Sequence, residues 1–287
     1  MMVSVIIPVY NEEKNLQYVI SSIKSALKGN FELLIINDGS TDKSADIIRN
    51  SGAVLVNQPY RMGNGAAIKR GIREAKGDIL VFMDGDGQHK AEDIHRLLEH
   101  IEEFDMVVGA RTNNSNMCLH RRLANKIYNW LASYVTSFRI EDLTCGFRAI
   151  KKTLALKFVY LLPNTFSYPT TLTLAVLKTG RSIKYIPITT TAREGKSKIN
   201  TIYDGAGFLL ILFKIATLFS PFKIFLPISI LFFILGLINY AYTFFTAHRF
   251  TSMSALLFTT SAIIFMLSLV SEQISLLRMQ HSEDNRE

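Results

Sequence analysis

Two long uncharged segments near the C-terminus constrain this chain more than any other feature. Residues 224–245 and 253–270 hold no charged side chain, and a helix needs about 20 apolar residues to cross a bilayer. A core helix of a soluble domain rarely stays uncharged over this length, so the pattern favours a transmembrane hairpin over two buried core helices. We place the hairpin at residues 223–277, with spans at about 224–245 and 253–273.

Charges flanking the hairpin predict its orientation. Lys214 and Lys223 precede the first span, and Arg278 follows the second. Positive residues favour the cytoplasmic side, so both ends and the large N-terminal part are expected in the cytoplasm. The chain is then a multi-pass protein of the inner or plasma membrane. Residues 201–222 are predicted to form a juxtamembrane amphipathic helix, and residues 278–287 a polar tail.

The first 200 residues alternate between strand and helix patterns. Apolar runs predict strands at 3–10, 31–38, 53–58, 78–84, 105–111 and 181–190. Amphipathic stretches predict helices at 12–27, from Ser40 or Thr41 onward, and at 65–76, 91–103 and 121–135. Nearly continuous apolar strands are typical of strands buried on both faces. The rhythm predicts an α/β domain over residues 1–200 with a mostly parallel, doubly wound sheet, whose N-terminal segment is a strand rather than a signal peptide.

The composition of the chain indicates which classes of binding partner to expect. A formal net charge of +8 and a pI of about 9.4 indicate an anionic partner, such as nucleic acid, anionic lipid or a phosphorylated substrate. The two cysteines, Cys118 and Cys145, have no metal-site or disulfide spacing and fit a reducing compartment. The mean hydropathy of +0.19 is high for a soluble protein and low for a polytopic transporter.

Polar groups follow three of the predicted strands. The end of the first strand carries Pro8, Tyr10, Asn11 and Glu12, the end of the second carries Asn37, Asp38, Gly39 and Ser40, and the end of the fourth carries Asp84, Asp86 and Gln88. Ligands of open α/β sheets bind beyond the carboxyl ends of the strands. If the sheet is parallel, these groups gather at one edge and form a ligand site.

Asp84 and Asp86 predict a divalent-cation site. Two neighbouring carboxylates repel each other unless a cation neutralises them, and Mg²⁺ or Mn²⁺ prefers oxygen ligands, including those of a diphosphate. Gly85 and Gly87 let the backbone approach a ligand closely, and Gln88 offers a neutral oxygen. The alternative is a Gly/Asp turn with solvated acids.

Two further residues have competing interpretations. Asp38 is placed to accept hydrogen bonds from a nucleotide base or ribose, or else to cap the following helix. Tyr10 is suited to stack on a base, or else to pack at the sheet edge.

These segments resemble a known family. "SVIIPVYNEE", "INDGSTDKS" and "GNGAAIKRGIREAKGDILVFMDGDGQH" resemble the family 2 glycosyltransferases, which have the GT-A fold, Rossmann-like with a mostly parallel sheet. "VVGAR", "RRLANKIYNWLA", "DLTCGFRAI" and "REGKSK" resemble more narrowly the polyprenyl-phosphate glycosyltransferases, among them dolichol-phosphate mannose synthases and bacterial undecaprenyl-phosphate sugar transferases. The resemblance covers about residues 1–200.

The resemblance implies roles for individual residues. The nucleotide sugar would be held by Pro8, Tyr10, Glu12, Asp38 and Gly85, and the metal by Asp84, Asp86 and Gln88. The acceptor phosphate would be bound by Arg111 and Arg122. The donor diphosphate would be bound by Arg193 with Lys196 or Lys198. Two departures stand out. The family often has two acids where this chain has Asn37 and Asp38. Its basic loop usually has two residues between Arg and Gly, whereas only Glu194 intervenes here, which leaves the choice between Lys196 and Lys198 open.

The reaction expected from these groups transfers a sugar from a UDP- or GDP-linked donor to the phosphate of undecaprenyl or dolichyl phosphate. A divalent ion with Arg193 and a lysine would stabilise the leaving diphosphate. A phosphate acceptor is already largely a dianion at neutral pH and needs cations rather than a general base. Arg111, Arg121 and Arg122 suit this role, or else belong to a solvated or lipid-facing basic stretch. Asp142 either orients a substrate or pairs with a cation, and His89 is interpreted as a helix-start residue.

Other functions fit less well. A processive polysaccharide synthase typically carries Q-x-x-R-W, but the only tryptophan, Trp130, lies in "KIYNW". A nucleotidyltransferase would show a glycine-rich loop near the first strand. A non-catalytic membrane subunit or lipid carrier would not need Asp84, Asp86, Arg193 and Lys198. No nucleic acid is expected as a partner. The sequence leaves open the sugar, the nucleotide, the lipid, the anomeric outcome and whether the chain forms a homo-oligomer.

Overall fold

The computed structural model describes residues 1–112, 119–164, 167–191, 217 and 220–284, with only the backbone described at 119–124 and 278–284. The chain divides into two compact units, residues 1–201 and 202–287.

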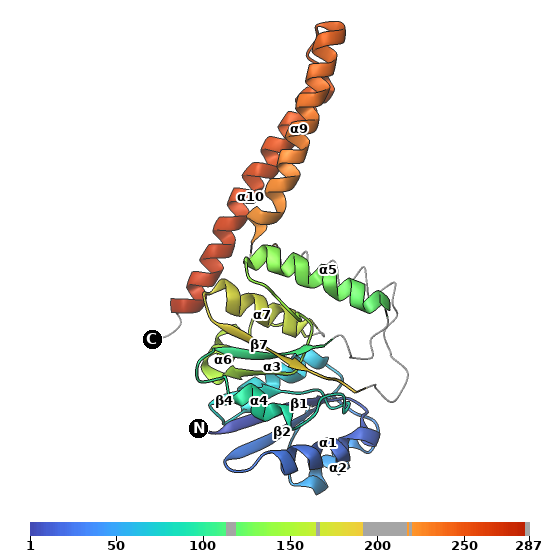
Figure 1. Ribbon diagram of the computed structural model, residues 1–287, viewed down its shortest axis with the longest axis vertical. Coiled ribbons are helices and arrows are strands. Elements are labelled where there is room, and N and C mark those ends of the chain that lie inside the picture. The colour runs from blue at the N-terminus through green and yellow to red at the C-terminus, as the bar shows by residue number, and fades with distance from the viewer. Residues whose placement is uncertain (113–118, 165–166, 192–216, 218–219, 285–287) are drawn as a thin grey trace. The chain divides into compact units, whose positions relative to one another are not determined.

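The first unit contains the predicted α/β sheet (Figure 1). Its strands within the described residues are β1 Val3–Val9, β2 Phe31–Asn37, β3 Val54–Asn57, β4 Ile79–Phe82, β5 Met106–Arg111, β6 Arg148–Lys151 and β7 Ile183–Ile188, in the order β3-β2-β1-β4-β6-β5-β7. β6 runs antiparallel to β4 and β5, and the other described pairings are parallel. The prediction of a mostly parallel sheet is confirmed.

Helices connect the strands. They are α1 Glu13–Ala26, α2 Ser44–Ser51, α3 Asn64–Glu74, α4 Asp93–Leu98, α5 Leu119–Thr136, α6 Lys152–Phe158 and α7 Tyr168–Lys178. α3 packs on β1 and β2, and α4 packs against β5, β6 and β7. The central strands form the core: Val5, Ile6 and Ile7 of β1 and Leu80 and Val81 of β4 are fully buried.

Two predictions about helix starts are wrong. α2 begins at Ser44, not at Ser40 or Thr41, because Asp42 accepts hydrogen bonds from the amides of Ser44, at 3.0 Å, and Glu13, at 3.1 Å. These bonds lower the pKa of Asp42 although its partial burial opposes ionisation. His89 does not start a helix either, since α4 begins at Asp93.

The second unit contains a helical hairpin. α9 Pro221–Ala247 and α10 Ser252–Asp284 run antiparallel and lie side by side (Figure 1). Both are long and apolar enough, by length and composition, to cross a membrane. The hydroxyl of Ser229 donates to the carbonyl of Ser261 at 3.0 Å, and the hydroxyl of Ser254 donates to Asn239 Oδ1 at 2.8 Å.

Small residues line the contact between α9 and α10. The buried serines of α10 recur every seven residues, at Ser254, Ser261, Ser268 and Ser275. A seven-residue repeat keeps one face of a helix against its partner, and small side chains let the two backbones approach closely. Most of the large apolar side chains of both helices are instead exposed. The predicted juxtamembrane helix at 201–222 falls largely outside the described residues.

Candidate active site

The carboxyl ends of β1, β2 and β4 meet at one edge of the sheet. The register pairs Val9 with Asn37 and Ile6 with Phe82, so the three parallel strands end close together. The predicted site residues at this edge are Pro8, Tyr10, Glu12, Asp38, Asp84 and Asp86. β5 ends at the same edge, because β4 and β5 both run antiparallel to β6. Arg111, the last residue of β5, therefore joins the group.

The turn after β2 holds the segment that approaches Tyr10. Asp38 is 3% exposed, and its carboxylate accepts hydrogen bonds from the amides of Met62 at 2.6 Å and Gly63 at 3.0 Å. Gly39 has φ +68°, and a Cβ there would lie 2.7 Å from the amide nitrogen of Arg61. The guanidinium of Arg61 lies 4.4 Å from the centroid of the Tyr10 ring. Asp38 thus anchors the loop that brings a cation over the predicted stacking residue.

The turn after β1 is tied to the turn after β2. Asn11 adopts φ 55°, a left-handed conformation that asparagine tolerates better than most residues. Its side-chain oxygen accepts from the Thr41 amide at 2.8 Å, and its own amide donates to Ser40 Oγ at 3.1 Å. The next amide, that of Glu12, donates to Ser44 Oγ at 3.1 Å. These bonds fix the backbone of the turns after β1 and β2 relative to each other.

Asp84 and Asp86 lie in the turn that follows β4. The side chain of Asp84 is 37% exposed, and Asp86 Oδ1 accepts from the Gln88 amide at 3.2 Å within the same turn. Among the described residues, no three His, Cys, Asp or Glu side chains converge as a complete metal site. Mg²⁺ commonly binds one or two carboxylates together with substrate phosphates. The two carboxylates of Asp84 and Asp86 therefore fit an ion whose remaining ligands come from a substrate.

Thr191 connects this acidic turn to the end of β7. Its amide donates to the carbonyl of Gln88 at 3.1 Å, and its hydroxyl donates to the carbonyl of Gly87 at 3.2 Å. The side-chain amide of Gln88 donates in return to the Thr191 carbonyl at 3.4 Å. The chain that leaves β7 is therefore held against the turn carrying Asp84 and Asp86.

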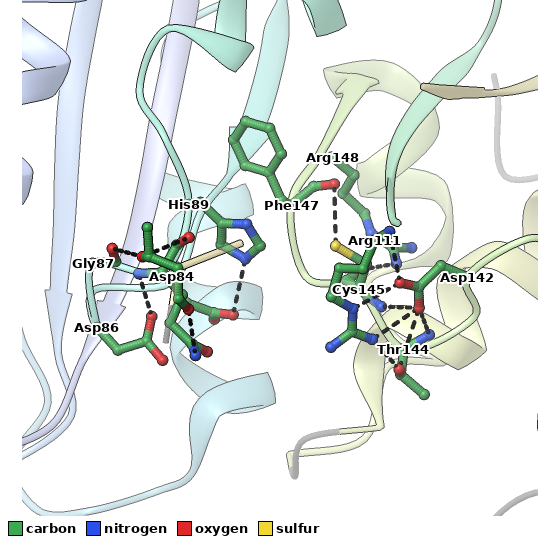
Figure 2. Close-up of polar contacts among 12 residues, drawn as sticks. Asp84, Asp86, Gly87, His89, Arg111, Asp142, Thr144, Cys145, Phe147 and Arg148 are labelled. Carbon is green, nitrogen blue, oxygen red and sulfur yellow. Dashed lines mark hydrogen bonds and ion pairs between the residues drawn. The ribbon is translucent and has the colours of Figure 1, made fainter. Parts of the chain in front are cut away.

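Arg111 is held by Asp142. Arg111 Nε donates to Asp142 Oδ2 at 2.7 Å and Nη2 to Oδ1 at 2.9 Å, while Nη2 also donates to Thr144 Oγ1 at 2.5 Å (Figure 2). Burial opposes ionisation of Asp142, but the hydrogen bonds and charge of Arg111 outweigh it and lower its pKa. The same pairing raises the pKa of Arg111 in spite of its burial. Both side chains are therefore charged at neutral pH.

Asp142 forms the salt bridge that the sequence offered as one of its two possible roles. Its side chain is 8% exposed, and Oδ1 also accepts from the amides of Thr144 and Cys145, at 3.2 and 3.1 Å. Burial and the negative charge of Asp142 raise the pKa of the Cys145 thiol to about 12. Cys145 thus stays protonated at neutral pH, as expected for an ordinary buried thiol.

Several predicted site residues lie outside the described side chains. The side chain of Arg122 is not described, although its backbone lies in α5. Arg193, Lys196 and Lys198 fall in the undescribed segment after Thr191. Their predicted roles stay predictions.

Sequence reasoning missed four residues that shape this edge: Arg61, Gly146, Thr191 and the buried His89. Gly146 leaves room for Asp84, since a Cβ there would lie 3.1 Å from Asp84 Oδ2. The "QH" that follows "DGDG" was the available signal for His89, because a histidine directly after an acidic turn stays within reach of its carboxylates.

The sheet order, the antiparallel β6 and the acidic turn define a GT-A-like glycosyltransferase domain. The chain belongs to glycosyl transferase family 2, whose model matches residues 4–160. The family resemblance expected from the motifs is confirmed. A second model, the GtrB C-terminal hairpin, matches residues 220–277, which contain α9 and most of α10.

Curated relatives carry a specific name. The chain is 33% identical to the undecaprenyl-phosphate 4-deoxy-4-formamido-L-arabinose transferase of Photorhabdus laumondii, over 58% of this chain and 57% of the relative. It is 36% identical to the protein of the same name from Aeromonas hydrophila, over 53% and 49%. The chain thus spans about half the length of the curated relatives it matches.

Solved structures support the fold. Glucosyl-3-phosphoglycerate synthase of Mycobacterium tuberculosis, in complex with Mn²⁺, UDP-glucose and phosphoglyceric acid, superposes with a TM-score of 0.63. The two chains are 20% identical, over 75% of this chain and 79% of that chain.

Proposed function

We propose that this protein is a membrane-anchored glycosyltransferase that moves a sugar from a nucleoside-diphosphate donor to the phosphate of a polyprenyl phosphate. One observation carries the proposal: the acidic pair Asp84 and Asp86 and the fixed guanidinium of Arg111 lie at the same edge of the sheet. The first would serve a donor diphosphate and the second an acceptor phosphate. The names of the curated relatives support the same class of acceptor.

The donor would lie along the ends of β1, β2 and β4. Tyr10 and Arg61 offer a stacked surface for the base. Pro8, near the end of β1, and the turns that contain Glu12 and Asp38 would orient the nucleotide. Gly85 keeps the backbone close to β1, since a Cβ there would lie 3.1 Å from Val9 Cγ2.

Asp84, Asp86 and Gln88 would hold a divalent cation, Mg²⁺ or Mn²⁺, on the donor diphosphate. Such an ion, when bound, acts as a Lewis acid that stabilises the charge of the leaving diphosphate. The mycobacterial synthase, a protein of this fold, was crystallised in complex with Mn²⁺ and UDP-glucose, which supports a divalent ion. Arg193, with Lys196 or Lys198, would add positive charge to the same diphosphate.

The acceptor phosphate would meet Arg111, with Arg122 as a second cation. A phosphate monoester carries about −1.5 to −2 charges at pH 7, so it attacks without a general base. Asp142 would position Arg111, because its two carboxylate oxygens accept from Nε and Nη2 and fix the guanidinium plane. These two bonds leave the N–H groups of Nη1 to donate to a phosphate oxygen. A fixed guanidinium loses little freedom when it binds a phosphate.

The membrane would present the acceptor. α5 exposes Ile127, Trp130 and Tyr134 at helical spacing, with Trp130 68% exposed, and Phe138 is exposed just beyond the end of the helix. Trp and Tyr prefer the bilayer interface, so this face fits a lipid surface. We propose residues 1–200 as the catalytic domain, 201–222 as a juxtamembrane helix, 223–277 as the membrane hairpin and 278–287 as a polar tail. The catalytic domain would be cytoplasmic in a multi-pass protein of the cell membrane.

The proposal is tested by transfer of radiolabel from a panel of UDP- and GDP-sugars into an organic-extractable lipid. Purified full-length protein is supplied with undecaprenyl phosphate and Mn²⁺ or Mg²⁺, with EDTA and Asp86→Ala as controls. Labelled lipid from one donor, lost in both controls, is the expected result. Absence of labelled lipid from every donor, with folded protein present, contradicts the proposal and favours a non-catalytic membrane subunit or lipid carrier.

A further inference from the structure

The side chain of His89 is largely buried directly beside the acidic turn. Its side chain is 7% exposed, and its imidazole stacks on the ring of Phe147, with centroids 5.0 Å apart and planes at 14°. Nε2 lies 3.9 Å from Asp84 Oδ2 (Figure 2). Phe147 is fully buried just before β6. The imidazole of His89 is therefore held in place by Phe147, from a distant part of the chain, and its Nε2 faces Asp84, a predicted metal ligand.

The other ring nitrogen indicates which way the imidazole donates. Nδ1 of His89 is buried and has no hydrogen-bond partner within the described part of the chain. A buried N–H without an acceptor costs about 1–3 kcal/mol, so the neutral ring is better placed with its proton on Nε2. In that tautomer, the N–H of His89 is directed at the carboxylate of Asp84.

We propose that His89 is a positioning residue that holds Asp84 in the orientation needed to bind a divalent cation. The inference rests on the proposed function, which makes Asp84 a metal ligand. The 3.9 Å separation is longer than a hydrogen bond, so the proposal requires the Asp84 carboxylate to turn toward Nε2 when it binds the cation. Ligating carboxylates are themselves commonly held by hydrogen bonds, and loss of such a partner typically weakens metal binding by about 10–100-fold.

The segment before β6 shapes this arrangement from the opposite side. A Cβ on Gly146 would lie 3.1 Å from Asp84 Oδ2 and 3.1 Å from the hydroxyl of Tyr168. Gly146 therefore leaves room for the Asp84 carboxylate where it lies, while Phe147 next to it stacks on the imidazole and limits its rotation. These two neighbouring residues thus leave space for the Asp84 carboxylate and hold the imidazole of His89 that would donate to it.

The test is the Mn²⁺ affinity of the purified full-length protein, measured by electron paramagnetic resonance of free Mn²⁺ with and without UDP. The variants are His89→Phe, which keeps a ring against Phe147 without a donor, and His89→Gln, which restores a donor near the Nε2 position. We expect affinity to fall about 10-fold in His89→Phe and to stay within about 3-fold in His89→Gln. Asp84→Asn is expected to lose most of the binding.

A role in packing alone predicts the reverse order, with His89→Phe unchanged and His89→Gln weakened along with its melting temperature. Wild-type Mn²⁺ affinity in His89→Phe overturns the inference while the proposed function stands, provided that Asp84→Asn abolishes binding. If the wild-type protein binds no Mn²⁺, or Asp84→Asn binds it normally, the proposed metal role fails and the inference fails with it.

Discussion

The carboxylate of Asp142 accepts three hydrogen bonds from Arg111: two from side-chain nitrogens, at 2.7 and 2.9 Å, and one from the backbone amide, at 3.2 Å. The carboxylate comes from the segment before β6, while Arg111 ends β5. The pair thus fixes a cation at the edge of the sheet where the acidic turn lies. Neutralising one partner leaves the other as an unpaired, largely buried charge. This lowers the stability of the folded protein more than replacing both partners does.

We predict that Asp142→Asn destabilises the protein by about 3 kcal/mol, the lower end of the range for breaking a buried pair, since the amide oxygen still accepts. Transfer should fall as well, through a higher KM for the lipid acceptor. Thermal unfolding in detergent and acceptor titrations measure both effects. The matched control is Asp46→Asn, which breaks the exposed pair with Arg49 and should cost less than about 0.5 kcal/mol. Equal effects of the two substitutions contradict the role given to Asp142.

The same pair predicts a pH dependence of stability. Because the folded state lowers the pKa of Asp142, its contribution is complete above the unfolded pKa of about 3.9 and is lost as pH falls through the folded pKa. The melting temperatures of wild type and Asp142→Asn should therefore differ at pH 7 and converge below about pH 4. A constant difference down to pH 3 argues against an ionised Asp142 in the folded protein.

Gly146→Ala should impair transfer more than stability. The added methyl group would lie 3.1 Å from Asp84 Oδ2, so the carboxylate must shift by a few tenths of an ångström. We expect kcat to fall about 10-fold, since small misplacements of a positioning group are costly, while the melting temperature changes little. A variant with full activity shows that Asp84 does not need this space. A variant that loses transfer only in proportion to its folded fraction points to a packing defect.

Thr191 is predicted to support the acidic turn through its hydroxyl. Thr191→Val removes the bond to the carbonyl of Gly87 and keeps the shape of the side chain. A lost hydrogen bond of about 1 kcal/mol corresponds to a roughly 5-fold fall in kcat/KM. Thr191→Ser keeps the hydroxyl and serves as the matched control. Equal activity of the Val and Ser variants shows that the hydroxyl has no part in supporting the turn.

The hairpin offers a stability prediction of its own. Ser261 is 5% exposed at the contact between α9 and α10, so Ser261→Leu overpacks the seam and should destabilise the hairpin by about 1–3 kcal/mol. Thr259→Leu, on the exposed face of α10, is the control and should be neutral. Thermal unfolding in detergent monitors both. Similar stability of the two variants shows that the serine seam does not hold the helices together.

The parallel part of the sheet could be predicted because each strand is an apolar run that ends in polar residues, as in β1 and β4. β6 could not, since it is four residues long and starts with an arginine, a residue rarely fully buried. Arg148 is nevertheless fully buried, with Nη1 donating to the Pro169 carbonyl at 2.9 Å and to Thr173 Oγ1 at 3.0 Å. Acceptors supplied by α7 make this burial tolerable, and no local pattern shows them.

Within the site, the sequence could indicate Asp84 and Asp86, because two acids between glycines after a buried strand form a local signal. The partners of these acids could not be found in this way. Thr191 contacts Gln88 across 103 residues, and His89 meets Phe147 through the packing of β6 beside β4. Asp142 shows the same limit: its residue type suggested substrate contact or a salt bridge, and the sequence could not identify Arg111, 31 residues away, as its salt-bridge partner.

The central claim is that the nucleophile is a phosphate. The most direct measurement compares initial rates of sugar transfer to undecaprenyl phosphate and to undecaprenol, with the same donor, Mn²⁺ and full-length protein. We predict labelled lipid from the phosphate alone, at a rate that collapses in Asp86→Ala. Transfer to the alcohol at a comparable rate would contradict the claim, because an alcohol acceptor requires a general base and the proposed mechanism gives that role to no residue.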